Sequence, residues 1–204
     1  MDCWPWPPSA ARLTQNLISN GSFEDVGGTP LAPGAWGLFD SIPSWVSDPK
    51  LRDIEVQSST IIAAQDGANY IELESDPGNS SYSVVAQSFT VAAAGDYLLS
   101  FFYAPRTGVE GDNLVNASID GIVLTSPSGV TPAGWTMITA IVTLSAGDHI
   151  LAFDAFGSID NTLGGFVDNV DISAVPLPPG LILLGTGVAG IGYMGRRRAK
   201  KAKA

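Results

Sequence analysis

The sequence predicts an all-β fold, an antiparallel jelly-roll β-sandwich, followed by a single apolar C-terminal helix. Three observations indicate this. Apolar and polar residues alternate along several stretches before residue 174, with the period of two that belongs to strands. Turn-forming residues recur roughly every 8–15 residues, so we expect about eight to ten strands and no helix in that part. Residues 174–204 lack this pattern and form a separate tail.

Three strands are expected in the middle of the chain. Residues 69–75 place Ile71 and Leu73 on one face and the two glutamates on the other. Residues 81–91 place a mainly apolar row along one side, and residues 96–103 carry large apolar side chains on both faces, as a strand inside a sandwich does. The rows that share a face are Val85, Gln87, Phe89 and Val91 in the second strand, and Tyr97, Leu99, Phe101 and Tyr103 in the third.

A β-hairpin is expected over residues 114–125. Residues 114–119 and 122–125 are largely apolar runs on either side of Asp120-Gly121. An Asp-Gly pair is the strongest short hairpin signal, because both central residues of the tight turn need positive φ.

A second hairpin is expected over residues 135–156. Residues 135–144 and 149–156 read as strands, and the Ser-Ala-Gly-Asp segment between them favours a tight turn. A final strand is expected over residues 165–172. Together these elements predict one domain over residues 16–173.

The chain before the tail is strongly acidic. It holds all 20 acidic residues and four basic ones, so its formal net charge is −16. Such a charge argues against nucleic acid as a partner, because the phosphates would repel it. It suits an extracellular domain and offers carboxylates to Ca²⁺, although solubility alone would account for most of it. The four basic residues are Arg12, Lys50, Arg52 and Arg106.

Residues 174–204 are predicted to be a membrane and sorting tail. A proline-rich segment at 175–180 precedes an uncharged apolar run at 181–195, which is expected to be a transmembrane helix. As a helix this run would be about 22 Å long, shorter than the usual span of about 20 residues. The basic tip at 196–204 would stay cytoplasmic by the positive-inside rule. The alternative is a buried core helix with a solvated basic end, which should show an apolar stripe instead. The membrane stop would be Arg196, Arg197 and Arg198.

Pro-Leu-Pro-Pro, a short Gly-rich apolar run and an Arg cluster follow one another in this tail. Their order resembles the PEP-CTERM sorting signal of Gram-negative bacteria, which is cut by an exosortase, a membrane transpeptidase. The sorting motif would be Val175, Pro176, Leu177 and Pro178, with Leu in place of the usual Glu. The resemblance implies a single-pass inner-membrane intermediate with the body outside and the C-terminus cytoplasmic, and then a cell-surface or secreted product.

Residues 1–15 are expected to be a disordered N-terminal remnant. They carry three prolines and no apolar run like the one of about 7–15 residues in a secretory signal. Export is therefore expected to depend on a start further upstream or on a leader that has been lost.

Two segments near the ends of the predicted domain carry a second resemblance. Residues 16–25 read Asn-Leu-Ile-Ser-Asn-Gly-Ser-Phe-Glu-Asp, and residues 164–171 read Gly-Gly-Phe-Val-Asp-Asn-Val-Asp. With the segments between them, they resemble jelly-roll carbohydrate-binding modules and the DUF642 family of plant walls and bacterial exoproteins. The intervening segments that agree in order are 42–45, 66–73, 85–89 and 95–101.

The second resemblance implies a structural Ca²⁺ where the first and last strands lie close together. Its carboxylate ligands would be Glu24 and Asp168, with backbone carbonyls completing the roughly 6–8 oxygens that Ca²⁺ takes. By alternation, Asp168 should share a face with Phe166 and Val170, and a carboxylate on an apolar face needs a partner. The alternative is that Glu24 and Asp168 are ordinary strand-end residues.

Five aromatic residues are candidates for a platform on which sugar rings stack, although aromatic residues at strand spacing lie more often in the core. We expect Trp45, which follows Ile-Pro-Ser, to lie in the core, and Tyr103, near Arg106 at a strand end, to be the most exposed. The pattern assigns no sugar subsite. The candidates are Trp36, Trp45, Tyr82, Tyr103 and Trp135.

The sequence favours a protein that is not an enzyme. Its one histidine, His149, is expected to be a surface residue whose hydrogen bonds are satisfied. The sequence has no nucleophile elbow, zinc-protease motif or phosphate loop. We expect an exported surface or extracellular-matrix protein that binds envelope polysaccharide or exopolysaccharide. One alternative is a structural surface-coat or biofilm protein without a specific ligand. Another is a glycosidase, which would need two carboxylates at the floor of a cleft.

Overall fold

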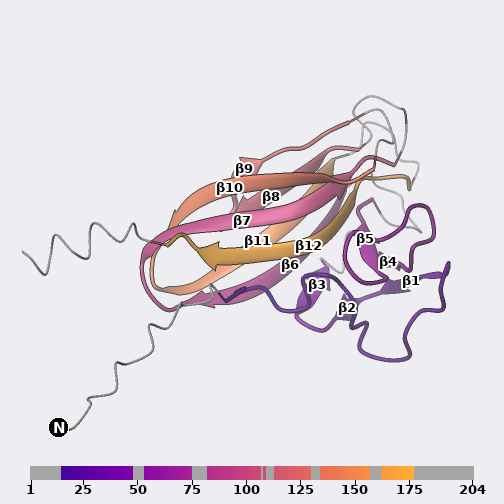
Figure 1. Cartoon of the computed structure of the whole chain (residues 1–204), viewed down its shortest axis with the longest axis horizontal. Helices are drawn as coiled ribbons and strands as arrows, with labels where there is room; N and C mark the ends of the chain where they lie inside the picture. The colour runs from indigo at the N-terminus through magenta and orange to yellow at the C-terminus, as the bar shows by residue number, and fades with distance from the viewer. Residues whose placement is uncertain are drawn as a thin grey trace, which may run out of the picture. The chain divides into compact units, whose positions relative to one another are not determined.

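Figure 1 shows the computed structural model of the chain. The chain divides into two compact units, Met1–Ala174 and Val175–Ala204. The structure describes the following residues, without the side chains of Tyr82 and Phe156: 15–47, 53–74, 82–106, 108, 113–129, 134–156 and 162–176.

Most of the predicted tail lies outside the described residues. Val175 and Pro176 are described, whereas Leu177, Pro178 and the apolar run at 181–195 are not. Within the described ranges, no helix is long and apolar enough to cross a membrane. The transmembrane helix therefore stays a prediction. Arg196, Arg197, Arg198 and residues 1–14 of the predicted remnant also lie outside the described residues.

The described part of the first unit contains twelve strands in two six-stranded antiparallel sheets (Figure 1). In sheet A the strands lie in the order β1 (Trp36–Phe39), β4 (Ile54–Gln57), β5 (Tyr70–Glu72), β12 (Phe166–Ala174), β7 (Gly95–Ala104) and β10 (Thr136–Leu144). In sheet B the order is β2 (Ser41–Ile42), β3 (Trp45–Ser47), β6 (Tyr82–Val91), β11 (Gly147–Phe156), β8 (Val115–Ile119) and β9 (Ile122–Thr125). The all-β prediction is confirmed, and the two-sheet arrangement is consistent with a jelly-roll sandwich. The four short strands β1 to β4, of two to four residues each, raise the number above the expected eight to ten.

Alternating side chains of both sheets fill the space between them. The predicted rows on β6 and β7 are all buried in one hydrophobic core, together with the polar Gln87. Trp45 has no exposed surface and packs on Phe23 and Phe153, with ring centroids 5.2 and 6.1 Å away. The expectation that Trp45 belongs to the core is therefore confirmed.

The first predicted hairpin is confirmed and the second is wrong. Strands β8 and β9 pair across Asp120 and Gly121, whose φ angles are 52° and 77°. Strand β10 instead pairs with β7, and β11 pairs with β6 and β8. The segment around residues 145–146 thus carries the chain from sheet A to sheet B. Two alternating strands joined by a short turn can pair with each other or lie in opposite sheets. Here the pairing of β10 with β7 and of β11 with β6 and β8 decides for opposite sheets.

The N-terminal segment runs beside the last strand, as the second resemblance implied. The N–H of Leu17 donates to the carbonyl of Ile172 at 2.8 Å, and the N–H of Val170 donates to the carbonyl of Gly21 at 2.9 Å. A Cβ atom at Gly21 would lie 2.2 Å from the Val170 carbonyl oxygen, so this approach requires glycine. The first and last parts of the domain therefore close the sandwich together.

An irregularity in β12 changes the predicted position of Asp168. The register shifts between Asp168 and Asp171, and Asn169 has a φ of 49°. The extra residue reverses the alternation. Val167 and Val170 therefore both lie in the core, and Asp168 faces the other way. The expectation that Asp168 shares a face with Val170 is wrong for this reason.

Candidate functional site

The outer face of sheet A carries an unusual set of buried polar side chains. On β4 and β5, Ile54, Val56 and Ile71 face the core, so the residues between them face outward. Glu55 is the register partner of Glu72, and Gln57 is that of Tyr70. These four outward side chains are nevertheless at most 4% exposed.

Residues 58–69, which we call the 58–69 loop, connect β4 to β5 and account for part of this burial. Tyr70 and Phe166 form a small apolar cluster on this face, against which Ile62 and Ala64 of the loop pack. Trp135 completes the cover, with its ring centroid 5.5 Å from that of Tyr70 and its indole N–H donating to the Ala63 carbonyl at 2.8 Å. The face is therefore covered by the loop that joins its two strands and by Trp135, which is distant in sequence.

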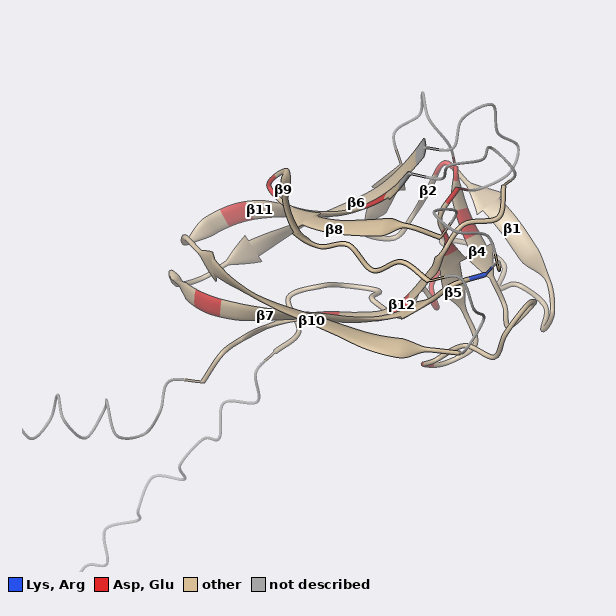
Figure 2. Cartoon of the chain, turned by 90° about the horizontal axis from the view of Figure 1, so that it is seen from above, with Lys and Arg blue, Asp and Glu red and all other residues tan. Residues whose placement is uncertain are grey.

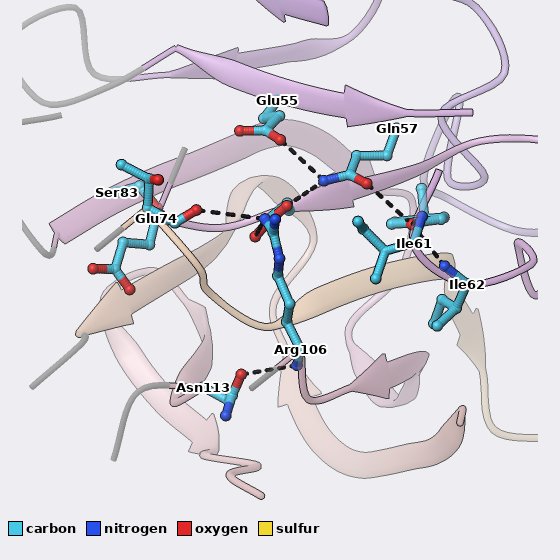
Figure 3. Close-up of polar contacts among 11 residues, drawn as sticks. Glu55, Gln57, Ile61, Ile62, Glu74, Ser83, Arg106 and Asn113 are labelled. Carbon is cyan, nitrogen blue, oxygen red and sulfur yellow. Dashed lines mark hydrogen bonds and ion pairs between the residues drawn. The ribbon is translucent and has the colours of Figure 1, made fainter. Parts of the chain in front are cut away.

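Hydrogen bonds join the buried polar side chains into one network (Figure 3). Gln57 Nε2 donates to Glu55 Oε1 at 3.0 Å and also to Glu72 Oε2. Tyr70 Oη donates to Gln57 Oε1 at 3.2 Å and accepts from the N–H groups of Ile61 and Ile62. Each side chain is thus held in one orientation by its neighbours.

Arg106 supplies the cation of this network. It follows the end of β7, and its backbone N–H donates to Asn113 Oδ1 at 2.8 Å. Its Nη1 donates to Glu72 Oε1 in an ion pair, in which the Arg106 side chain is 21% exposed and that of Glu72 is fully buried. Burial raises the pKa of Glu72 to about 9, and the hydrogen bond from Arg106 opposes this rise.

Part of the network borders a small pocket of about 160 Å³. Trp36, on the edge strand β1, is 48% exposed and forms one side of it. Glu72 is not among the lining residues and belongs to the layer beneath. The lining residues are Trp36, Glu55, Gln57, Thr60, Ile61, Arg106 and Thr162.

The predicted calcium ligands both contact the 58–69 loop. Glu24 Oε1 accepts from the N–H groups of Ala68 and Asn69 at 2.9 and 2.8 Å. Asp168 Oδ2 accepts from the N–H groups of Gln65 and Asp66 at 2.8 and 3.0 Å. The structure thus brings both residues to the loop that carries Thr60 and Ile61 of the pocket.

Backbone amides occupy the positions where a cation would be expected. Besides its bonds to the loop, Asp168 accepts from the N–H of Asn169 through Oδ1 at 2.6 Å, so both its oxygens point at donors. In the described part of the chain, no group of three or more His, Cys, Asp and Glu side chains is placed to hold a metal ion. This donor arrangement fits Ca²⁺ poorly at Asp168, and calcium binding stays a prediction. Burial raises the pKa of Asp168 to about 7, against the hydrogen bonds of these amides.

The aromatic candidates separate into different environments. Tyr103, expected to be exposed, is 4% exposed, and its hydroxyl donates to the Asn113 carbonyl at 2.8 Å. That expectation is wrong because Tyr103 lies in the row of β7 that faces the hydrophobic core. Trp135 is half-buried, and the side chain of Tyr82 is outside the described part. Trp36 thus remains the candidate with an extensively exposed ring among the described ones.

His149 is satisfied, as expected, but it is buried rather than on the surface. Its Nδ1 lies 2.7 Å from Asp120 Oδ2 and its Nε2 lies 3.0 Å from the Ser145 carbonyl. The Asp120 carboxylate raises the pKa of His149. These contacts tie the β8–β9 turn to β11 and indicate a structural role.

Sequence reasoning missed the pocket itself. Alternation placed Glu72 opposite Ile71, but it gave no sign that this outward face is covered or that Arg106 reaches it. Glu55, Gln57 and Thr162 carried no motif. The one available signal was composition: Arg106 is one of four basic residues before the tail.

Comparison with known proteins supports the fold. No protein-family model matches the chain, and no curated protein matches it in sequence. Among solved structures, TmCBM61 in complex with beta-1,4-galactotriose is similar, with a TM-score of 0.51 and 15% identity over 79% of this chain and 100% of that chain. A family 35 carbohydrate-binding module from Clostridium thermocellum gives a TM-score of 0.46 and 16% identity over 69% and 99% of the two chains. CBM35 from Paenibacillus barcinonensis gives 0.45 and 15% over 69% and 99%. At such identities the similarity to TmCBM61 establishes a shared sandwich fold.

Proposed function

We propose that this chain is a non-catalytic polysaccharide-binding protein of the cell envelope and that the pocket beside Trp36 holds a sugar unit. One observation carries the proposal: Trp36, a residue that is 48% exposed, borders a cavity whose other lining is mostly polar. An aromatic face suits the C–H face of a sugar ring, and nearby polar groups fix its orientation. The related fold of TmCBM61, solved with beta-1,4-galactotriose, supports a ligand of this class.

The pocket is preorganised. Gln57 is held by Tyr70, Glu55 and Glu72, and Arg106 is held by Glu72 and through its own backbone by Asn113. A ligand would meet side chains that have already lost their rotational freedom. Binding then costs less conformational entropy than it would on a mobile surface.

The arrangement supports binding rather than hydrolysis. A glycosidase needs two carboxylates that flank the scissile bond. Among the described residues that line the pocket, Glu55 is the one carboxylate. Glu72 is occupied beneath it by Gln57 and Arg106. The pocket therefore does not support the glycosidase alternative.

The proposed location follows from the tail. The tail, residues 174–204, would be processed by an exosortase after the chain is held in the inner membrane with its body outside. The protein would then act at the cell surface or in the matrix, where polysaccharide is abundant. The competing proposal is a structural surface-coat protein of a biofilm, with no specific ligand.

Binding of the full chain to a panel of envelope and matrix polysaccharides, followed by calorimetry on the best ligand, tests the proposal. We expect W36A to lower the affinity at least tenfold, and W36F to lower it less because a ring remains. M137A is the matched control, since Met137 is 60% exposed on β10 and is not among the pocket-lining residues. Equal loss in M137A, or no binding by the unaltered chain, would contradict the proposal and favour the surface-coat alternative.

A further inference from the structure

The ring of His149 has a hydrogen-bond acceptor at each of its two nitrogens. Nδ1 lies 2.7 Å from Asp120 Oδ2, and Nε2 lies 3.0 Å from the Ser145 carbonyl oxygen. A carbonyl oxygen only accepts, so Nε2 must carry a proton to bind it. Hydrogen bonds from His149 and from the N–H of Ile150 lower the pKa of Asp120, whose side chain is 47% exposed. Asp120 is therefore an ionised acceptor near neutral pH, and Nδ1 must carry a proton too.

We propose that His149 is doubly protonated in the folded chain and that its contacts with Asp120 and Ser145 form a latch, which loosens as the pH rises. A neutral imidazole has one N–H and one lone pair, so it can donate to one of these two acceptors but not to both. Loss of a proton therefore changes one hydrogen bond into a repulsive contact between lone pairs. The latch does not depend on the sugar pocket.

The latch joins segments that belong to different sheets. Asp120 lies in the β8–β9 turn of sheet B, and Ser145 directly follows the end of β10 in sheet A. Asp120 is also bound to Ile150 of β11: its N–H donates to the Ile150 carbonyl at 2.9 Å, and its Oδ1 accepts from the Ile150 N–H at 3.0 Å. Weakening the contact between His149 and Asp120 therefore loosens the edge hairpin of sheet B where it meets β11.

The charges around His149 favour its protonated form. Asp120 faces the ring from the β8–β9 turn, and Asp148 precedes His149 on β11. On β6 the neighbour is the uncharged ring of Phe89, whose centroid lies 5.7 Å from that of the imidazole. Arg106 is the one Lys or Arg among the residues that the structure describes, and Figure 2 shows this basic position near β5 rather than at the turn. The imidazolium is thus the cation that these two aspartates meet.

The direction of the pH dependence follows from these contacts. The hydrogen bonds with Asp120 and Ser145 raise the pKa of His149 above its ordinary value of 6.5, and burial of the ring opposes this rise. The latch therefore contributes its full stabilisation between the ordinary pKa values of Asp120 and His149, 3.8 and 6.5. This stabilisation is lost as the pH rises through the raised pKa of His149, and again as the pH falls through the lowered pKa of Asp120.

Because the chain has one histidine, ¹⁵N NMR of the full chain titrates this ring directly. We expect both ring nitrogens to carry protons at pH 6.5 and the titration midpoint to lie above 6.5. D120N should fold, since Asn-Gly also favours this tight turn, and should lower the midpoint. D148N should lower it less, because Asp148 acts on the ring through its charge alone. A midpoint at or below 6.5 in the unaltered chain, or equal shifts in the two variants, would overturn the proposal.

Amide hydrogen exchange tests the loosening itself. The N–H groups of Asp120 and Ile150 both donate at the latch, and Phe153, fully buried on β11, supplies a reference amide. After correction for the intrinsic effect of pH on exchange, we expect protection of the first two relative to Phe153 to fall several-fold as the pH rises through the NMR midpoint. Unchanged relative protection in the unaltered chain would overturn the proposal.

H149F is the matched control for this measurement. It keeps a ring beside Phe89 but cannot take up a proton, so the fall in relative protection should disappear. The same fall in H149F would contradict the latch. In D120N the fall should move to the lower midpoint of that variant, and this comparison decides the question if H149F does not fold.

Discussion

Arg106 and Glu72 form an ion pair beneath the pocket, although they lie 34 positions apart in the chain. Glu72 ends the three-residue strand β5, and Arg106 lies just beyond β7. Because β12 separates these two strands in sheet A, the pair bridges across it at one end of the sheet. The pair thus links the short strands that carry Glu55 and Gln57 to the long central strands.

Removing the Arg106 guanidinium tests how much its contact with the buried Glu72 contributes to stability. We expect R106M to lower the free energy of unfolding by about 1–3 kcal/mol, because it leaves an oxygen of the buried Glu72 carboxyl group without its hydrogen-bond donor. E72Q/R106M should recover part of that loss, since the double variant has no group at position 72 that can ionise. Urea unfolding of both single variants and the double variant gives the coupling energy. A loss below about 0.5 kcal/mol in R106M would show that the pair is energetically irrelevant.

The raised pKa of Glu72 predicts a pH dependence of stability. Between the ordinary pKa of 4.5 and the folded-state pKa of about 9, the folded chain retains a proton that the unfolded chain has released. The free energy of unfolding should therefore fall as the pH rises through this window. Chemical unfolding at pH 5, 7 and 9 should show the unaltered chain losing stability relative to E72Q. Parallel pH profiles for the two proteins would mean that the pKa of Glu72 is not raised.

Asp168 should be sensitive to loss of a single acceptor oxygen. Its two oxygens accept from three backbone N–H groups, of Gln65, Asp66 and Asn169. D168N would turn an amide toward at least one of them, at a cost of about 1–3 kcal/mol per unsatisfied group. We expect a lower thermal midpoint and faster amide exchange in the 58–69 loop. D171N on the same strand is the control, and an equal effect there would argue against the loop contacts.

The calcium prediction has its own test. If Glu24 and Asp168 hold Ca²⁺, the ion should raise the thermal midpoint of the full chain, and a chelator should reverse the rise. E24Q should abolish the calcium-dependent part, whereas D25N, next to it and exposed, should leave it intact. A midpoint that is the same with Ca²⁺ and with chelator would contradict the prediction and leave the backbone amides as the partners of both carboxylates.

Closure of the domain by its first segment can be tested at Gly21. A Cβ there would meet the Val170 carbonyl oxygen at 2.2 Å, a backbone atom that cannot move independently. We expect G21A to lower the free energy of unfolding by about 1–3 kcal/mol through overpacking. At Gly28 a Cβ would meet nothing within 4 Å, so G28A should change the free energy of unfolding by less than about 0.5 kcal/mol. Similar effects of the two substitutions would mean that the Gly21 contact does not matter.

Local pattern and turn chemistry determined much of this fold. The alternation over residues 81–103 identified the faces of β6 and β7 that enter the core. Asp120-Gly121 determined a hairpin because the turn needs two positive φ angles, which that pair accepts readily. The position of Trp45 in the core also followed from its sequence context. Each of these properties depends on residues that are close together in the chain.

Tertiary structure alone decided the rest. Pairing with β7 or β6 places β10 and β11 in different sheets, and one extra residue at Asn169 turns Asp168 away from Val170. Tyr70 and Phe166 are buried because the 58–69 loop and Trp135 pack on their face of sheet A, and Arg106 reaches Glu72 on that face from beyond β7. A period of two shows which residues share a face. Whether that face is exposed to water depends on which other segments pack over it. The pocket is formed by residues from several such segments.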